Sequence, residues 1–140
     1  TDQVAAAANT AYPITFDTTV FENGLTLGAD NYTITFEEEG IYMLSFSVQL
    51  LSSSSSAKNA WFWPRINGTD SAGSTIKVTL SANSQTLVMS RSAIFPMSAG
   101  DTLAAYWAVD DVDLHLDALA STAFAPSAPS VILGITRLRQ

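Results

Sequence analysis

The chain has 140 residues and a net charge of −7, and its six Lys and Arg residues are scattered except for Arg137 and Arg139. Phosphate binding needs clustered cations, so neither nucleic acid nor an anionic membrane surface is expected as a partner. There is no cysteine, which excludes disulfides and thiolate metal sites.

The balance of residue types has two interpretations. Hydrophobic residues make up 47% of the chain and charged residues 14%, whereas a typical soluble domain carries about 25% charged residues. Either copies of the chain hide surface against one another, or a small all-β domain has a surface of Ser and Thr. No apolar run reaches the ~20 residues that a membrane-spanning helix needs.

The N-terminal residues lack the basic segment and long apolar core of a signal peptide. We expect a flexible arm over residues 1–11, followed by a single domain over residues 12–140. Because an initiator Met is commonly removed before a residue such as Thr1, we also expect the chain to be a whole gene product.

Short strands separated by turns fill the rest of the chain. The Ala run at residues 5–8 ends too soon for a helix, and Asn23-Gly24 predicts a hairpin turn between strands at residues 20–21 and 25–27. Further strands are expected at residues 14–16, 32–36, 40–50, 60–66, 75–80, 87–95, 102–109, 114–119 and 131–138. The serines at residues 52–56 predict a flexible loop tip without a binding role, and residues 121–130 predict a second loop.

Alternation assigns faces to these strands, because successive side chains of a strand point to opposite sides. In the strand that starts at Gly40, the side chains expected in the core are Tyr42, Leu44, Phe46, Val48 and Leu50. In the strand at residues 87–95, one face carries Leu87, Met89, Arg91, Ala93 and Phe95, and the other carries Val88, Ser90, Ser92 and Ile94.

About ten short strands without a long helix predict an all-β antiparallel sandwich or jelly roll. Two strands are apolar on both faces. In one, Leu103, Trp107 and Val109 oppose Tyr106; in the other, Val131, Leu133 and Ile135 oppose Ile132 and Leu138. A strand that is apolar on both faces needs a second partner. We expect a neighbouring subunit, and the alternative is a covering loop or the N-terminal arm.

Several short motifs occur in an order that resembles a known family. They are Asn31-Tyr32 before a strand ending at Phe36, Gly40-Ile41-Tyr42 with Phe46, Arg65-Ile66-Asn67-Gly68, Gly100-Asp101-Thr102-Leu103, and the final strand at residues 130–138. This order is similar to that of the trimeric jelly roll shared by the globular head of the complement recognition protein and the tumour necrosis factor ligands, where the last strand is central. Here the last strand lacks the usual Phe-Ser-Gly-Phe pattern, which favours the bacteriophage relatives found in virion proteins.

The resemblance implies a structural role without a cofactor, and the missing catalytic set makes an enzyme such as a depolymerase the least favoured alternative. The chain would form a homotrimer through inner-sheet residues Tyr106, Ile132, Leu138 and Ile94. It would be made in the host cytoplasm and bind the major capsid protein on the outer surface of a tailed bacteriophage head, as a decoration or cement protein. The residues expected to contact the capsid are Thr1, Asp2, Gln3, Val4, Arg137 and Arg139. The alternative is a receptor- or glycan-binding head of a tail fibre or spike.

Few side chains suit catalysis or metal binding. His115, the only histidine, is expected on one strand face with Asp113 and Asp117. No nucleophile elbow accompanies it, so a solvated strand edge is favoured over catalysis. Asp110, Asp111 and Asp113 form an oxygen-rich loop that is a calcium candidate, with a solvated charge cluster as the alternative.

The aromatic stretch around Phe62 has a further interpretation. Alternation puts Trp61 and Trp63 on one face and Phe62 on the other. A role in the core is favoured, and the alternative is stacking on a glycan, since exposed tryptophans can anchor a partner. The acidic run at residues 37–39 predicts a solvated turn or a contact with a basic partner.

Overall fold

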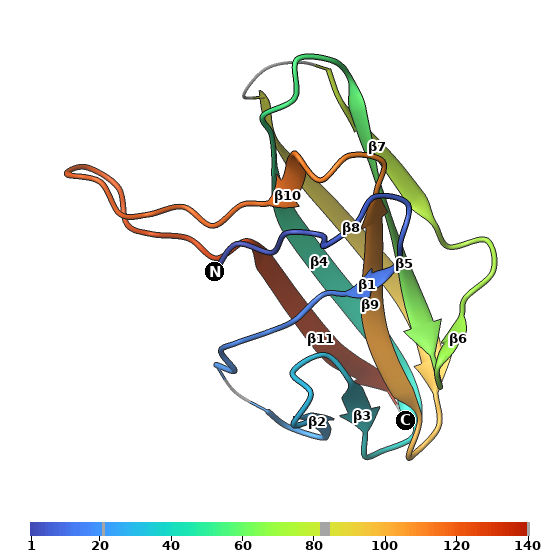
Figure 1. Cartoon of the computed structure of the whole chain (residues 1–140). Helices are drawn as coiled ribbons and strands as arrows, with labels where there is room; N and C mark the ends of the chain where they lie inside the picture. Colours follow the sequence, from blue (N-terminus) through green and yellow to red (C-terminus); the bar gives the residue numbers. More distant parts are fainter. Residues whose placement is uncertain (21, 82–84, 140) are drawn as a thin grey trace.

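The computed structural model describes residues 1–20, 22–81 and 85–139. Within these ranges every regular element is a β-strand (Figure 1). The strands are β1 (Tyr12–Pro13), β2 (Leu25–Leu27), β3 (Ile34–Phe36), β4 (Gly40–Ser52), β5 (Lys58–Ile66), β6 (Thr69–Asp70), β7 (Ile76–Leu80), β8 (Gln85–Met97), β9 (Thr102–Val109), β10 (Leu114–Leu116) and β11 (Val131–Arg139). This part of the chain has no helix that is long and apolar enough to span a membrane.

The strands form two antiparallel sheets that face each other as a sandwich (Figure 1). The seven-stranded sheet has the order β2-β3-β9-β5-β6, with β1 paired to β9 and β7 paired to β5. The four-stranded sheet has the order β10-β4-β11, with β8 along the other edge of β4. The predicted all-β antiparallel sandwich is therefore confirmed, and the sheets do not close into a barrel.

Strand β4 organises the four-stranded sheet. It pairs with β8 from Gly40 opposite Met97 to Ser52 opposite Gln85, while β11 and β10 share its other edge. The alternation predicted for β4 is confirmed, because Tyr42, Val48 and Leu50 are fully buried between the sheets. The alternation predicted for β8 is confirmed too, with its even-numbered residues exposed.

The core between the sheets contains two clusters of apolar side chains. The larger cluster includes Trp107, Phe62 and Val48. The smaller one joins Phe36 and Tyr42, whose rings meet edge to face with their centroids 4.7 Å apart. Such aromatic contacts stabilise a core beyond the area that they bury.

The N-terminal residues, expected to form a flexible arm, lie along the sandwich. The backbones of Gln3 and Leu116 exchange two hydrogen bonds of 3.0 Å, and the N–H of Asn9 donates to the carbonyl of Val109 at 2.7 Å. Ala5 is buried in the larger core cluster. The segment before β1 therefore adds a bridge next to β10.

Two loops differ from their predicted structures. Ser52 is the last residue of β4, and Ser52 and Ser54 are both buried. The backbone N–H of Ser53 donates to the carbonyl of Asp113 at 3.1 Å, so the serine stretch is tied down at its start. Strand β2 pairs with β3, and Val20, which was expected to lie in the partner strand of the hairpin, is outside any strand. The other residue of that expected strand, Phe21, lies outside the described residues.

The position of β11 also differs from the expectation of a central last strand. In the described part of the chain, β11 pairs with β4 alone and is an edge strand. The N-terminal segment does not cover this edge, because it bridges to β10 instead. The register of β11 shifts between Arg137 and Arg139, where the strand reaches the start of β4.

Candidate functional site

The outer surface of the four-stranded sheet carries no charged side chain over the middle of its three long strands. We call this surface the uncharged face, and it consists of Ile41, Met43, Ser45, Ser47 and Gln49 on β4, Val88, Ser90, Ser92, Ile94 and Pro96 on β8, and Ile132, Gly134 and Thr136 on β11. Ile94 is 67% exposed and Ile132 is 59% exposed. Exposed apolar side chains gathered on one face mark interaction surfaces.

The register divides the apolar members of this face into two groups, with Ile94 and Met43 on one side of the row Ser92, Ser45 and Gly134, and Ile132 and Val88 on the other. Met43 lies between Ile94 and Thr136 on the two neighbouring strands, and Ser47 lies between Ser90 and Ile132. Neighbouring strands are about 4.8 Å apart and rise about 3.3 Å per residue, so the face measures roughly 14 Å by 30 Å, or about 400 Å².

The structure brings together only part of the predicted trimer surface. Ile94 and Ile132 both belong to the uncharged face, and Leu138 is exposed at the irregular end of β11. Tyr106 belongs to β9 in the other sheet. Alternation predicted the face of each strand but carried no information about which sheet a strand would join.

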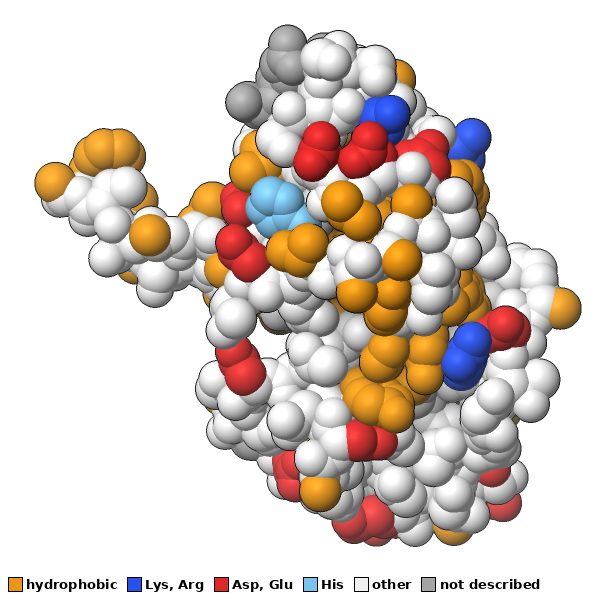
Figure 2. Space-filling model, in the orientation of Figure 1, with side chains coloured by type: hydrophobic (Ala, Val, Ile, Leu, Met, Phe, Trp, Pro, Cys, Tyr) orange, Lys and Arg blue, Asp and Glu red, His pale blue; other side chains and the backbone are white. Residues whose placement is uncertain are grey.

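Tyr106 instead lies in an aromatic group on the outer surface of the seven-stranded sheet, which Figure 2 views from the front. The Arg65 guanidinium lies 3.8 Å from the centre of the Tyr106 ring, and the Trp63 ring is 6.4 Å from it. Asp70 accepts hydrogen bonds from Arg65 Nε at 2.6 Å and Trp63 Nε1 at 2.8 Å. These bonds, with Arg65 first, lower the pKa of Asp70, and the same carboxylate raises the pKa of Arg65.

The predicted alternation of the aromatic stretch in β5 is confirmed. Phe62 is buried against the opposite sheet, while Trp61 and Trp63 are half-buried. Lys77 Nζ lies 5.8 Å from the Trp61 ring. Trp61 and Trp63 are therefore not simply core residues.

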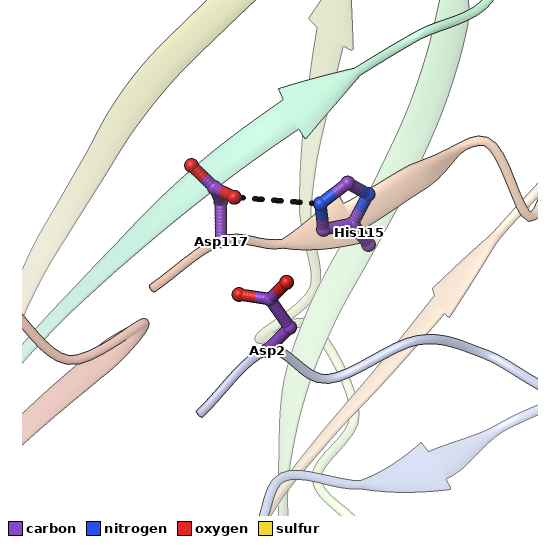
Figure 3. Close-up of side chains that lie close together, drawn as sticks. All are labelled: Asp2, His115 and Asp117. Atoms are coloured by element: carbon purple, nitrogen blue, oxygen red, sulfur yellow. Dashed lines mark ion pairs between the residues drawn. The ribbon is translucent and has the colours of Figure 1, made fainter. Parts of the chain in front are cut away.

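His115 and Asp117 form a small polar cluster with a residue from the start of the chain (Figure 3). His115 Nε2 lies 3.4 Å from Asp117 Oδ1, as expected from their shared face. The third member is Asp2, not Asp113, and its carboxylate also accepts a hydrogen bond from the Ala118 N–H at 2.7 Å. Sequence spacing gave no signal for Asp2, because it arrives from the opposite end of the chain.

This cluster offers one imidazole nitrogen and two carboxylate oxygens within 4.8 Å of one another. Zinc and other first-row divalent ions accept such ligands, so the three side chains could hold an ion with positions left for water. The contacts that the structure contains have another effect. Through Asp2, they fasten the first residues of the chain beside β10.

In the described structure, the carboxylates of the calcium candidate, Asp110, Asp111 and Asp113, do not lie close enough together to hold one ion. Asp110 accepts two bonds of 2.8 Å from the backbone and side chain of Asn59, and Asp111 pairs with Lys58 Nζ at 3.2 Å. The Asp113 N–H donates to Asp111, which with Lys58 lowers the pKa of Asp111. Because protein donors already occupy the carboxylates of Asp110 and Asp111, the arrangement matches a structural charge cluster.

Most of the residues expected to contact a capsid make contacts within the domain. The carbonyl of Thr1 accepts a bond from Ser130 Oγ at 2.8 Å, and the Gln3 side chain bonds to both backbone groups of Thr15 at 2.9 Å. Arg137 binds Glu38 at 2.7 Å and the carbonyl of Glu39.

The acidic run therefore supports the end of β11. Of the expected contact residues, Val4 and Arg139 have exposed side chains that make no such bond in the described structure.

One feature was predicted only as a loop. Leu119 and Ala128 exchange two backbone hydrogen bonds of 2.9 Å, and the segment between them projects away from the sandwich (Figure 1). We call Leu119–Ala128 the projecting arm. Phe124 near its tip is 91% exposed. The sequence feature that could have identified this arm is its lack of charge, because no charged residue occurs between Asp117 and Arg137.

A cavity of about 290 Å³ lies between the sheets. Its walls are almost entirely apolar and include Phe46, Phe62 and Phe95. Arg91 is the charged side chain on its wall, and the guanidinium donates to the carbonyl of Ser74 at 2.8 Å. The predicted inward direction of Arg91 is thus explained by a backbone acceptor across the sandwich.

Searches against models of protein families and against curated proteins find no match for this chain. The fold therefore defines the class, a two-sheet antiparallel β-sandwich. Three surfaces bear on function: the uncharged face, the aromatic group around Tyr106, and the projecting arm.

Proposed function

We propose that this chain is a structural virion protein, a homotrimeric jelly roll of the complement-head and tumour necrosis factor type that decorates the head of a tailed bacteriophage. The observation that carries the proposal is the uncharged face. Copies with a net charge of −7 repel one another, so they associate best where both surfaces lack charge. The exposed side chains of Met43, Val88, Ile94 and Ile132 supply the apolar area for that contact.

The path of the chain supports the jelly-roll part of the proposal. From β3 to β4, from β4 to β5, from β8 to β9 and from β9 to β10, the chain crosses from one sheet to the other. A meander would keep neighbouring strands in one sheet, whereas a jelly roll alternates between two.

The capsid contact needs a narrower assignment than the whole N-terminal segment. Removing residues 1–11 would also remove the Gln3 bridge and buried Ala5, so a truncated protein would lose domain stability together with any capsid contact. Val4 and Arg139 are exposed and are the residues of choice for the capsid surface. Point variants at these two positions leave the domain contacts in place.

The first experiment is solution mass by light scattering after size exclusion, at micromolar and nanomolar concentrations. The proposal predicts three times the chain mass of 14.9 kDa at both concentrations. The second experiment is co-sedimentation with phage capsids assembled without this protein, using the wild type, Val4→Ser and Arg139→Gln. A monomer at both concentrations, or a trimer that never sediments with capsids, would refute the proposed role.

A second candidate is a glycan-binding head of a tail fibre or spike. The aromatic group favours it, because Trp63 and Tyr106 offer rings while Arg65 and Asp70 offer polar groups beside them. Trp63→Ala should abolish binding to an array of bacterial surface oligosaccharides, and Val20→Ser should leave it unchanged. If the wild type binds no oligosaccharide on the array, this candidate is wrong.

A further inference from the structure

The projecting arm is hydrogen-bonded to the domain at its base, and its tip is exposed. At the base, the backbone of Gln49 in β4 binds the segments that enter and leave the arm. The Gln49 carbonyl accepts from the Asp117 N–H at 2.8 Å, and the Gln49 N–H donates to the carbonyl of Ser130 at 2.9 Å. The Gln49 side chain adds a bond of 2.9 Å to the carbonyl of Pro129. The arm is therefore anchored on a residue of the uncharged face.

The tip is ordered by its own residues. The Thr122 hydroxyl accepts bonds from the N–H groups of Phe124 and Ala125, and the Thr122 N–H donates to the carbonyl of Ala125 at 2.8 Å. In the described structure, no hydrogen bond joins residues 120–127 to the body of the domain. The Phe124 side chain is thus held in solvent on a hydrogen-bonded turn, and Figure 2 shows hydrophobic side chains at the end of the projecting segment.

We propose that the projecting arm is an exchange arm, which docks Phe124 on the uncharged face of a second copy of this chain. The inference rests on the oligomer in the proposed function and names the contact that holds its copies together. Each arm would reach the next copy, so the contact is head-to-tail, and three such contacts would close the ring of the proposed trimer.

The areas favour this pairing. The uncharged face provides about 400 Å², roughly half of the ~800 Å² that each partner contributes to a stable interface. A buried aromatic side chain adds about 150–250 Å², and the flanking Ala and Pro residues of the arm extend the contact. In a ring every copy contributes a face to one neighbour and an arm to the other, so each copy buries roughly 550–650 Å² over its two contacts, whereas a face that met only another face would bury about 400 Å².

Charge favours a second copy over a lipid surface. The arm and the uncharged face both lack charged residues, so neither has to bury an unpaired charge. A membrane-inserting loop normally has basic residues nearby to meet anionic lipid. Here Asp117 and Asp2 flank the base of the arm, which disfavours a lipid surface.

The first test compares Phe124→Ser with Val20→Ser, a matched control at a valine that is 89% exposed in another loop. By analytical ultracentrifugation, Phe124→Ser should raise the concentration at which the oligomer dissociates by at least about 30-fold, the effect of losing an interface hot spot. Val20→Ser should leave it unchanged. Far-ultraviolet circular dichroism checks that both variants remain folded.

The second test uses the absence of cysteine from the chain. Chains with Ala123→Cys, at an exposed residue beside an intact Phe124, and chains with Ile94→Cys are mixed, reassembled and oxidised. The mixture should form a disulfide-linked pair that contains one chain of each kind, whereas Val20→Cys mixed with Ile94→Cys should not.

The outcomes separate the two proposals. A monomeric wild type refutes both the oligomer and the exchange arm. An oligomeric wild type with unaffected Phe124→Ser and no specific cross-link refutes the exchange arm alone. If Phe124→Ser remains oligomeric but loses binding to capsids or to anionic lipid vesicles, the arm serves that partner and the inference is wrong.

Discussion

Substitution of Gly40 by Ala tests how tightly β4 and β11 approach each other at the bulge. A Cβ atom on Gly40 would lie 2.6 Å from the Arg139 carbonyl oxygen and 2.7 Å from Arg137 Nε. An ordinary contact starts at 3.4 Å, so the end of β11 has to move by about 0.8 Å. Because the nearest atom belongs to the backbone, a change of side-chain rotamer cannot relieve the overlap.

Overpacking of this kind costs about 1–3 kcal/mol. With an unfolding entropy of about 2.1 cal/mol/K per residue over 140 residues, the expected fall in Tm is roughly 3–10 °C. Differential scanning calorimetry measures the fall, at concentrations where both proteins have the same oligomeric mass. The control is Gly134→Ala in the middle of β11, whose added Cβ has no neighbour within 4 Å. If Gly40→Ala melts with the wild type and Gly134→Ala, the close approach is wrong.

Two further predictions concern stability. Val48→Ala should lower the free energy of unfolding by about 2–3 kcal/mol, because truncating a fully buried side chain leaves a cavity. The control, Val112→Ala at a valine that is 40% exposed, should change it little. Equal effects of the two substitutions in urea titrations would contradict the assigned core. Hydrogen bonds from the Ser98 N–H and Asn67 lower the pKa of Asp101 below its ordinary value of 3.8. Asp101 therefore stabilises the fold above that pH, and its contribution is lost as the pH falls through the lowered pKa. Asp101→Asn should flatten the acid side of a plot of Tm against pH, and an unchanged plot would contradict this role.

The period-two pattern predicted the strands and their faces well. In β4 and β8, a shift of one residue would turn every core side chain outward, so the burial of Tyr42 and Met89 agrees with the predicted faces. The Asn67-Gly68 turn was also predictable, because both residues adopt positive φ angles that Asn and Gly tolerate best.

Long-range placement was not predictable. No local pattern pairs Asp2 with His115, or shows that Gln3 bridges to Leu116. Tyr106 and Ile94 both lie in apolar stretches of the sequence, but their strands belong to different sheets. Such contacts depend on how the strands are ordered in space, which alternation along one strand does not encode.

The edge position of β11 has a consequence for the newly made chain. Its outer side offers unpaired backbone groups next to the exposed side chain of Ile132, and open edges of this kind recruit strands from other molecules. A newly made chain that forms the proposed oligomer would therefore face a kinetic competition between ordered assembly and edge-to-edge aggregation. The irregular register at Arg137 and Arg139 interrupts one end of that edge and leaves Val131 to Thr136 as the segment of β11 most open to such pairing.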